Sequence, residues 1–289
     1  MNKLGTIAFS IVALLLLIGS HAGSESELQP VVGLYGFGGA ERGNDRGING
    51  PAGAIGGTEV FGLYPFTETF GIQGGLLNQG GRGGYRLGVS AGPVYDYGSG
   101  KVGLFTDYIY QKRGSNNFVY LRGQWSHYFQ NWDLVFSYSQ PVNSVQHGPG
   151  TETITTQKPP PLCAESNVRK KSTAAPAINQ LTGFARIYPT ERIEVTLGLL
   201  VNSFAGPDHN KTGTGFGGVF GAAVQLTDWL LLRPVQGQMD TRERYRITSG
   251  LEFIWTPARK EKPERLLGEE RDTNFALASV GSTFISDPG

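Results

Sequence analysis

The sequence predicts an all-β fold, a transmembrane antiparallel up-and-down β-barrel of about twelve strands, with ten or fourteen as the alternatives. Three observations support this prediction. The gaps between strand-like runs alternate short and long, several runs alternate apolar with polar residues, and aromatic residues gather where the runs end. Short turns on one side and long loops on the other are typical of barrels in the bacterial outer membrane. A secreted β-sandwich is the competing fold, because its strands show the same two-residue period.

The N-terminus has the pattern of a cleaved secretory signal peptide over residues 1–22. Lys3 supplies the positive charge, residues 7–18 form the apolar run, and Ser20-His21-Ala22 is a small-x-small cleavage site. The apolar run is shorter than the about 20 residues of a spanning helix. We therefore expect export, with an outer membrane barrel over residues 23–256 and a periplasmic C-terminal extension over residues 257–289.

Composition excludes several classes of function. The formal net charge of +1 gives no electrostatic case for binding nucleic acid. The single Cys163 cannot form an internal disulfide, and the scattered histidines show no metal-ligand spacing, so we expect neither a metal nor a cofactor. Glycine occurs 43 times in 289 residues, about twice the usual ~7% share, and recurs within the strand-like runs. Glycine in a strand marks bends and close approach, which suits a tightly curved barrel.

The predicted strands are mostly close to the about 9–11 residues that a tilted strand needs to cross a bilayer. Alternation is clear in residues 85–95, where Tyr85, Leu87 and Val89 lie opposite Arg86 and Ser90. The other runs show the same period with a few exceptions. The predicted strands cover residues 31–38, 54–63, 70–77, 85–95, 101–110, 118–128, 132–139, 181–188, 193–202, 215–226, 229–235 and 245–255.

The rhythm of the gaps also predicts an orientation. If the first strand rises from the periplasm, the short turns at 64–68, 97–100, 130–131, 189–191 and 227–228 all lie on the periplasmic side. An even number of strands then places both ends of the barrel in the periplasm. The loops expected outside the cell are residues 39–53, 78–84, 111–117, 140–180, 203–214 and 236–244. The aromatic residues expected to form a girdle at the strand ends are Tyr64, Phe66, Tyr95, Tyr97, Tyr128, Phe129, Trp132, Tyr188 and Trp229.

The chain resembles the bacterial outer membrane β-barrel class in its signal peptide, in the turn-strand unit at 226–230 and in its last predicted strand. That strand, 245–255, leads through alternate apolar residues to a terminal aromatic and looks like the barrel-assembly signal of the class, carried by Tyr245, Leu251, Phe253 and Trp255. The resemblance implies recognition by the barrel-assembly machinery. The chain departs from the class because it continues beyond Trp255, and residues 275–285 offer one more strand-like run.

The predicted lumen face carries charges of both signs. They form either a polar path with a transverse field for small solutes or a network of salt bridges that fills the barrel. We favour structural pairing with a narrow water path, because paired charges avoid the desolvation cost of isolated ones. The lumen candidates are Arg86, Asp107, Arg122, Asp133, Arg186, Glu194, Arg246 and Glu252.

The stretch 140–180 is the candidate partner site. It contains a Lys-Pro-Pro-Pro run at 158–161 and then the basic cluster Arg169, Lys170 and Lys171. Proline and charge favour an extended, poorly ordered segment. The cluster is a candidate to contact anionic lipopolysaccharide or to fold inward as a gate, and a plain solvated loop is the alternative.

The function that fits these patterns best is a porin-like channel for small polar solutes in the bacterial outer membrane. A surface structural or adhesion barrel without transport is the alternative. No enzyme activity is expected, since His127, His147 and His209 lie in no hydrolase motif, although a lipid-active barrel enzyme is a weaker alternative. The expected partners are outer membrane lipid, lipopolysaccharide and small polar solutes.

Overall fold

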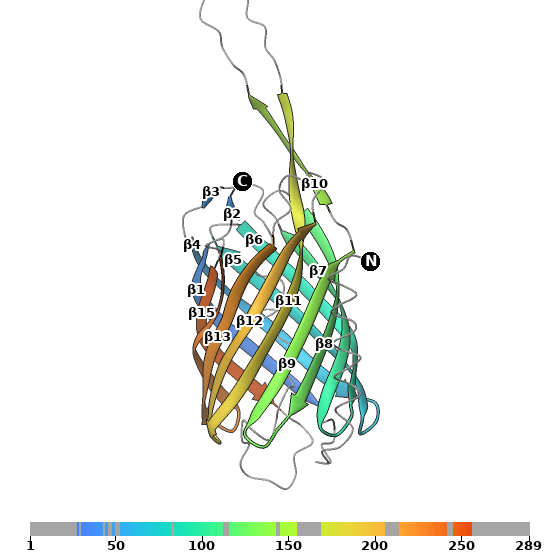
Figure 1. Ribbon diagram of the computed structural model, residues 1–289, viewed down its shortest axis with the longest axis vertical. Helices are drawn as coiled ribbons and strands as arrows, with labels where there is room; N and C mark the ends of the chain where they lie inside the picture. The colour runs from blue at the N-terminus through green and yellow to red at the C-terminus, as the bar shows by residue number, and fades with distance from the viewer. Residues whose placement is uncertain are drawn as a thin grey trace, which may run out of the picture.

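The computed structural model describes residues 28, 30–42, 44–45, 48–49, 53–81, 84–111, 116–142, 145–154, 169–205, 214–241 and 245–255. The predicted signal peptide, the extension at 257–289 and Cys163 lie outside the described residues. Twelve long strands form the barrel (Figure 1). They are β1 (Val31–Arg42), β4 (Gly53–Pro65), β5 (Phe70–Gly81), β6 (Gly84–Asp96), β7 (Gly100–Gln111), β8 (Asn116–Tyr128), β9 (Trp132–Pro141), β11 (Arg169–Thr190), β12 (Ile193–Ala205), β13 (Thr214–Thr227), β14 (Leu230–Asp240) and β15 (Tyr245–Trp255).

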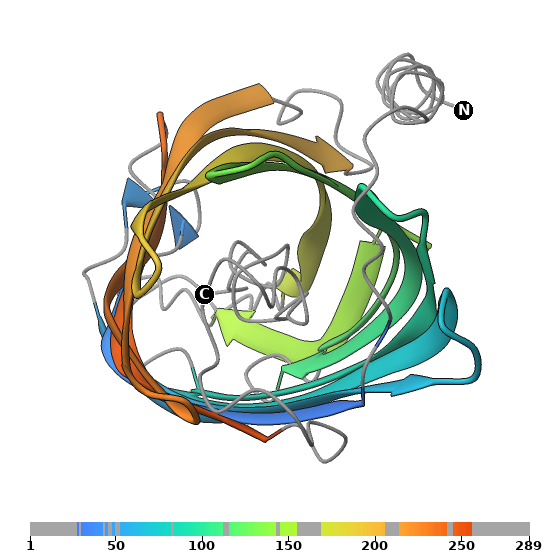
Figure 2. The ribbon, with the colours of Figure 1, turned by 90° about the horizontal axis from the view of Figure 1, so that it is seen from below.

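These strands close into a ring in which each is antiparallel to the next (Figure 2). β1 pairs with β15 from Val32↔Trp255 to Arg42↔Tyr245, and this pairing joins the two ends of the barrel. β9 pairs with β11 from Trp132↔Ile187 to Ser139↔Gln180, across the longest gap in the chain. The prediction of a closed antiparallel barrel with twelve strands is confirmed. Closure matters because it leaves no strand edge with unpaired backbone groups.

The outer face of the barrel is apolar. Leu199 is 74% exposed and Leu104 58%, and both point away from the barrel axis. The alternation predicted for β6 is confirmed, because Leu87 and Val89 are exposed while Arg86 is buried. A continuous exposed apolar surface of this size is unfavourable in water and favourable against lipid. The described part of the chain contains no helix that could cross a membrane.

One end of the barrel, which we call the turn end, carries the short connections. In the turn after β4, the Thr67 hydroxyl accepts a hydrogen bond from the Phe70 N–H at 2.9 Å. In the turn after β6, the Asp96 carboxylate accepts from the Gly98 N–H at 2.8 Å, and Gly98 has a φ of 88° that favours glycine. These local hydrogen bonds explain why so few residues suffice to reverse the chain.

Exposed aromatic residues surround the turn end, with Tyr64 at 64% and Trp229 at 54%. Phe129 and Trp132 stack with ring centroids 3.9 Å apart. Two members of the predicted girdle do not belong to it. Tyr188 is buried inside the barrel, and the Tyr128 ring faces the inward Lys101 ammonium. Both occupy inward positions of their strands, so their place in the two-residue period outweighs their place at a strand end.

At the opposite end, which we call the loop end, the strands run further than predicted. β5 and β6 are paired as far as Gly81↔Gly84, so the predicted loop 78–84 shrinks to residues 82–83. Gly84 has a φ of 95°, which favours glycine at this tight reversal. Apolar alternation stops short of the true strand ends because the ladder needs only backbone groups, and polar residues pair equally well beyond the lipid. In the first loop, Asn44–Asp45 (β2) and Ile48–Asn49 (β3) form a small ribbon.

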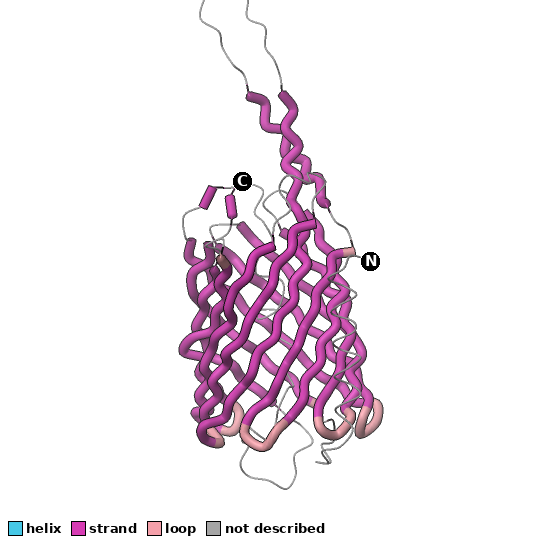
Figure 3. Tube along the Cα trace, in the orientation of Figure 1, coloured by secondary structure: helices cyan, strands magenta, loops and turns pink. Residues whose placement is uncertain are grey.

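The stretch predicted as the loop 140–180 contains regular structure. β10 (Val145–Ile154) pairs with the first part of β11, from Val145↔Pro176 to Ile154↔Arg169. The two strands form a ribbon that leads away from the barrel rim (Figure 3). The expectation of a poorly ordered segment is therefore wrong for residues 145–154 and 169–176, although both are extended as expected. The described ribbon strands lie beyond the rim of the barrel (Figure 3).

Candidate functional site

All eight charged residues predicted to line the lumen lie on inward positions of the strands. Every one except Arg186 is at most 6% exposed, and the Arg186 side chain is 12% exposed. Seven of the eight take part in ion pairs, which occur near the turn end, in the middle of the wall and at the loop end, whereas Arg246 rests on the Phe37 ring. The interpretation as structural pairing is consistent with these contacts, because buried charges are stable only when they are paired.

The pair in the middle of the wall joins β7 and β8. Arg122 Nε lies 2.7 Å from Asp107 Oδ2, and Arg122 Nη2 lies 3.0 Å from Asp107 Oδ1. The Ser90 hydroxyl donates to Asp107 at 2.6 Å and accepts from Arg122 at 3.0 Å. The guanidinium also lies 4.4 Å from the centre of the Phe105 ring. A guanidinium held at two points cannot reorient without losing both bonds.

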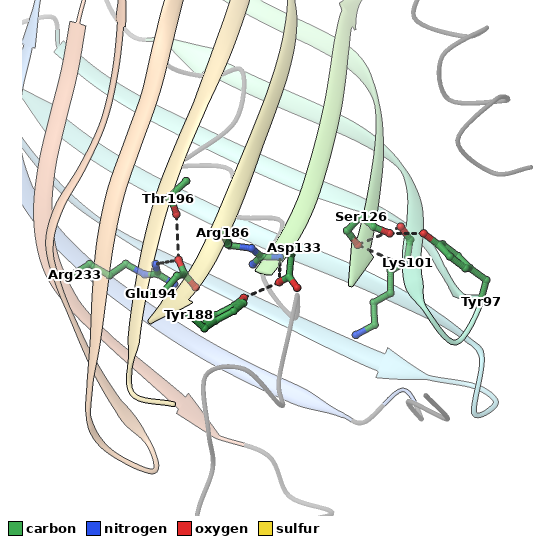
Figure 4. Close-up of polar contacts among 9 residues, drawn as sticks. All are labelled: Tyr97, Lys101, Ser126, Asp133, Arg186, Tyr188, Glu194, Thr196 and Arg233. Atoms are coloured by element: carbon green, nitrogen blue, oxygen red, sulfur yellow. Dashed lines mark hydrogen bonds and ion pairs between the residues drawn. The ribbon is translucent and has the colours of Figure 1, made fainter. Parts of the chain in front are cut away.

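Two further clusters lie near the turn end (Figure 4). Arg233 contacts two carboxylates, Glu252 at 2.5 Å and Glu194 at 3.6 Å. Asp133 accepts a hydrogen bond from the Tyr188 hydroxyl at 2.7 Å and pairs with Arg186 at 3.4 Å. Each carboxylate therefore faces a cation from a neighbouring part of the wall.

A third charged contact at the turn end involves Lys101, whose ammonium lies 4.0 Å from Asp96. Ser126 packs beside it and exchanges hydrogen bonds of 3.3 Å with the Lys101 backbone in both directions. The Tyr97 hydroxyl donates to the Ser126 carbonyl at 2.5 Å, tying the turn to β8 (Figure 4).

At the loop end, Arg86 holds Glu41 at two points, with distances of 3.1 and 3.4 Å. Gln79 donates a third hydrogen bond to Glu41 at 3.3 Å. The Arg246 guanidinium lies 5.2 Å from the centre of the Phe37 ring. This end of the wall therefore combines a bound carboxylate with a cation resting on an aromatic face.

Sequence reasoning missed several inward charged residues. Glu41 and Asp240 fell in predicted loops because the apolar alternation had already ended. Arg233 lies in the run Leu230-Leu231-Leu232-Arg233-Pro234, which shows no alternation. A register shift between Arg233 and Gln236 there accommodates Pro234, which has no N–H to donate. No local pattern in the sequence marks these residues as inward. The missed residues are Glu41, Glu59, Asp96, Lys101, Arg233 and Asp240.

In the part of the β9–β11 seam nearer the loop end, beyond the Asp133–Arg186 pair, the inner wall is polar but uncharged. Ser137 pairs with Thr182 and Ser139 with Gln180 in the backbone register, and all four side chains are at most 2% exposed. We call these four residues the neutral strip. One member of the strip has a partner on the next strand: Gln180 Nε2 donates a hydrogen bond to the Asn202 amide oxygen of β12 at 3.0 Å. Uncharged hydroxyl and amide groups make this section of the wall able both to donate and to accept hydrogen bonds.

The inner wall also carries apolar side chains, in addition to the charged residues predicted to line the lumen. Tyr35 and Phe37 of β1 stack with centroids 5.4 Å apart and pack with Leu77 of β5. Leu28 covers Leu63, and further apolar residues follow on β6 and β7. The inner wall of β1 and β4–β7 therefore mixes aromatic and aliphatic groups with buried polar side chains such as Glu59 and Gln73.

The remaining candidates are placed as follows. Tyr245, Leu251, Phe253 and Trp255 share the outer face of β15, the strand that closes the barrel against β1. Arg169, Lys170 and Lys171 pair with Ile154, Thr153 and Glu152 at the far end of the β10–β11 ribbon.

His127 lies on the outer face, where its ring packs against Trp125 and Phe129. Within the described residues, no three His, Cys, Asp or Glu side chains gather as metal ligands.

Solved structures share this arrangement of strands. The COG4313 outer membrane channel from Pseudomonas putida F1 aligns with a TM-score of 0.52 at 10% identity, over 81% of this chain and 99% of its own. The fold is that of a bacterial outer membrane β-barrel. A chain solved in work on the in-meso crystallization of membrane proteins aligns with a TM-score of 0.50 at 9% identity, over 83% of this chain and 90% of its own.

A third solved structure, the NanC porin, aligns with a TM-score of 0.49 at 7% identity, over 78% of this chain and 99% of its own. No family model matches the chain, and no curated relative matches it. At sequence identities this low, the similarity to these solved structures concerns the fold alone. What the barrel does must be argued from its own inner wall and its own loops.

Proposed function

We propose that this chain is a porin-like channel of the bacterial outer membrane that passes small polar solutes. One observation carries the proposal: polar and ionised side chains occupy the inner wall from the turn end, at Asp133, to the loop end, at Arg86. The outer face at the same heights is apolar. A barrel that served only as an anchor would need the outer face alone. The same fold in the COG4313 outer membrane channel is compatible with this role.

The ion pairs suit passage of solutes better than tight capture. Arg122 and Asp107 neutralise one another across neighbouring strands, as do Arg186 and Asp133. A solute passing these two pairs meets hydrogen-bonding groups and charges that are already compensated, so neither pair would hold it strongly. Twelve strands place the barrel between the filled barrels of about 8 strands and the open porins of about 16–18, so the expected path is narrow.

Single-channel recording in planar lipid bilayers tests the proposal. We expect small, stable current steps in KCl from the refolded full chain. A folded barrel, verified by its β-sheet circular dichroism and heat-dependent gel mobility, that inserts without conducting would overturn the channel function. Swelling of liposomes in small sugars and amino acids provides the matching test for uncharged solutes.

A second function is favoured by one specific feature, the β10–β11 ribbon. It leads away from the barrel, and the basic register positions Arg169, Lys170 and Lys171 lie at its far end. We infer that this ribbon contacts an anionic surface such as lipopolysaccharide. Binding of the full chain to lipopolysaccharide-containing vesicles should weaken when all three residues are changed to glutamine. Equal binding by the triple variant and the wild type would exclude this role.

Two further contacts follow from the outer face. The apolar belt is proposed to contact outer membrane lipid, and the outward residues of β15 are proposed to engage the barrel-assembly machinery. Replacing Phe253 and Trp255 with serine should reduce the yield of assembled barrel in cells. The same variant should still fold from urea into detergent, because only the outward side chains change. If the yield in cells is unaffected, β15 does not carry the assembly signal.

A further inference from the structure

The neutral strip contains polar atoms that have no hydrogen-bond partner. The Oγ atoms of Ser137 and Ser139, Thr182 Oγ1 and Gln180 Oε1 are all buried and unpartnered. They come from two neighbouring strands and lie directly opposite one another in register. Opposed residues of adjacent strands lie about 5 Å apart, and alternate residues along a strand about 7 Å apart. The four oxygens therefore form one compact patch on the inward side of the wall.

Buried unpartnered atoms also occur at other side chains of the described residues, such as Gln73, Gln225 and Gln238, but here four of them lie on directly opposed residues, which requires an explanation. The serine and threonine hydroxyls can each donate and accept, and Gln180 Oε1 can accept while its Nε2 stays bound to Asn202. The strands on either side do not supply the missing bonds. Arg122, which is opposite Ser139 in the register of β8, is bound to Asp107, Ser90 and Gln124. The patch is therefore ready to bond a molecule that enters the barrel.

The charges near the neutral strip are already compensated. Arg122 lies on one side, paired with Asp107, and Arg186 lies towards the turn end, paired with Asp133. A charged solute would have to break one of these pairs to be bound at the patch. A neutral solute that carries several hydroxyl groups would satisfy the four oxygens without disturbing them.

The opposite side of the lumen carries an aromatic cluster. In the ring of strands, β9 and β11 lie half-way round from β1 and β4 (Figure 2). There Tyr35 and Phe37 stack beside Leu77. Ligand sites commonly combine such an apolar surface with a few placed polar groups. A sugar ring presents hydroxyl groups at its edge and C–H groups on its face, so its chemistry matches both sides.

We propose that the neutral strip is a binding station for a neutral sugar passing through the barrel. This inference rests on the proposed channel function and specifies the class of solute. Removing one hydroxyl that bonds the sugar should weaken binding about two- to twelvefold, which corresponds to about 0.5–1.5 kcal/mol for a neutral hydrogen bond. The variant Ser137→Ala/Thr182→Val removes two hydroxyls and should show the larger effect.

The experiment measures block of the single-channel current by glucose and maltose, with gluconate as the charged comparison. We expect concentration-dependent block by the neutral sugars at lower concentration than by gluconate, and weaker sugar block in Ser137→Ala/Thr182→Val. The matched control is Ser126→Ala, another buried inward serine, whose hydroxyl is already bonded to the Lys101 carbonyl. Its sugar block should equal that of the wild type.

The outcomes separate this inference from the channel function. A conducting wild type that the neutral sugars do not block, or that gluconate blocks equally well, overturns the inference and leaves the channel intact. Equal loss of block in Ser126→Ala and in the double variant also overturns it. If the barrel does not conduct, titration calorimetry of the full chain in detergent with maltose still tests the station. No heat of binding there would overturn the inference independently.

Discussion

Arg122 and Asp107 form a two-point ion pair on the inner wall, with Nε–Oδ2 at 2.7 Å and Nη2–Oδ1 at 3.0 Å. Arg122 is fully buried and Asp107 is 4% exposed. The pair links β7 to β8, and the Ser90 hydroxyl extends it to β6. Its energetic value depends on both partners, because each charge is stable there only in the presence of the other.

Replacing Arg122 with methionine should therefore destabilise the barrel strongly. Loss of one partner of a buried pair costs about 3–5 kcal/mol, since the remaining carboxylate is left uncompensated. Urea unfolding of the barrel in lipid vesicles measures the change. The double variant Arg122→Met/Asp107→Leu should recover most of the lost stability. If the double variant is as unstable as the single variant, packing of the arginine rather than its charge is responsible.

The outer face should tolerate charge at its rim but not at its centre. Leu199 lies in the middle of β12 and is 74% exposed, whereas Leu226 lies beside the turn after β13 and is 46% exposed. Arginine should cost about 2–4 kcal/mol at Leu199 and about 0–1 kcal/mol at Leu226, because the cost depends on depth in the bilayer. Folding titrations in vesicles compare the two variants. Equal free-energy costs at Leu199 and Leu226 would show that the two positions do not differ in depth in the bilayer.

Two glycines in the strands should respond differently to alanine. A Cβ at Gly198 would overlap the Cβ of Phe184 and the carbonyl oxygen of Gly183 on the neighbouring strand. A Cβ at Gly123 would meet nothing within 4 Å. We expect Gly198→Ala to cost about 1–3 kcal/mol through overpacking and Gly123→Ala to be close to neutral. Unfolding midpoints measure both, and a neutral Gly198→Ala would show that β11 and β12 can separate locally.

Arg233 should influence ion selectivity if the barrel conducts. It contacts both Glu194 and Glu252 near the turn end. Its replacement by glutamine removes one positive charge from the wall, so the lumen should favour potassium over chloride more strongly. The reversal potential in a KCl gradient measures this shift. Arg192→Gln, in an exposed turn, is the control and should leave the potential unchanged. An unchanged potential in Arg233→Gln would mean that ions do not pass this pair.

Removing the β10–β11 ribbon should leave the barrel intact. The seam between β9 and β11 is made by residues 132–139 and 180–187, and the ribbon residues 145–154 and 169–176 pair only with one another in the register. A variant in which residues 143–177 are replaced by a short glycine-containing turn should therefore unfold at the same urea concentration as the wild type. A large loss of stability would show that the ribbon supports the rim.

Much of the architecture could be predicted because one physical constraint repeats along the chain. Each strand must present one face to lipid and the other to the interior, so Arg86 and Ser90 alternate with Leu87 and Val89 in a readable way. The alternation fails where that constraint is weak. Glu41 lies at the loop end, where both faces can be polar, and its inward direction leaves no trace in the local pattern.

The contents of the lumen were harder to predict, because inward residues are selected by contacts across the barrel. Tyr188 was expected in the aromatic girdle, yet it lies inside the barrel, where its hydroxyl donates a hydrogen bond to Asp133. The neutral strip depends on the register between β9 and β11, and the long gap between them hides that register from local reasoning. Which oxygens remain unpartnered is a property of three-dimensional neighbours, and no spacing along the chain encodes it.

The pairing of β1 with β15 joins the two ends of the barrel sequence, so it requires both ends to be present. These strands are the first and last of the ring, so β1 keeps an unsatisfied edge until nearly all of the barrel has been synthesised. Contacts so distant in sequence form slowly, and an open strand edge promotes aggregation in the meantime. An assembling chain therefore needs protection in the periplasm for as long as β15 has not docked, and rapid docking of β15 is the step that ends this vulnerable period.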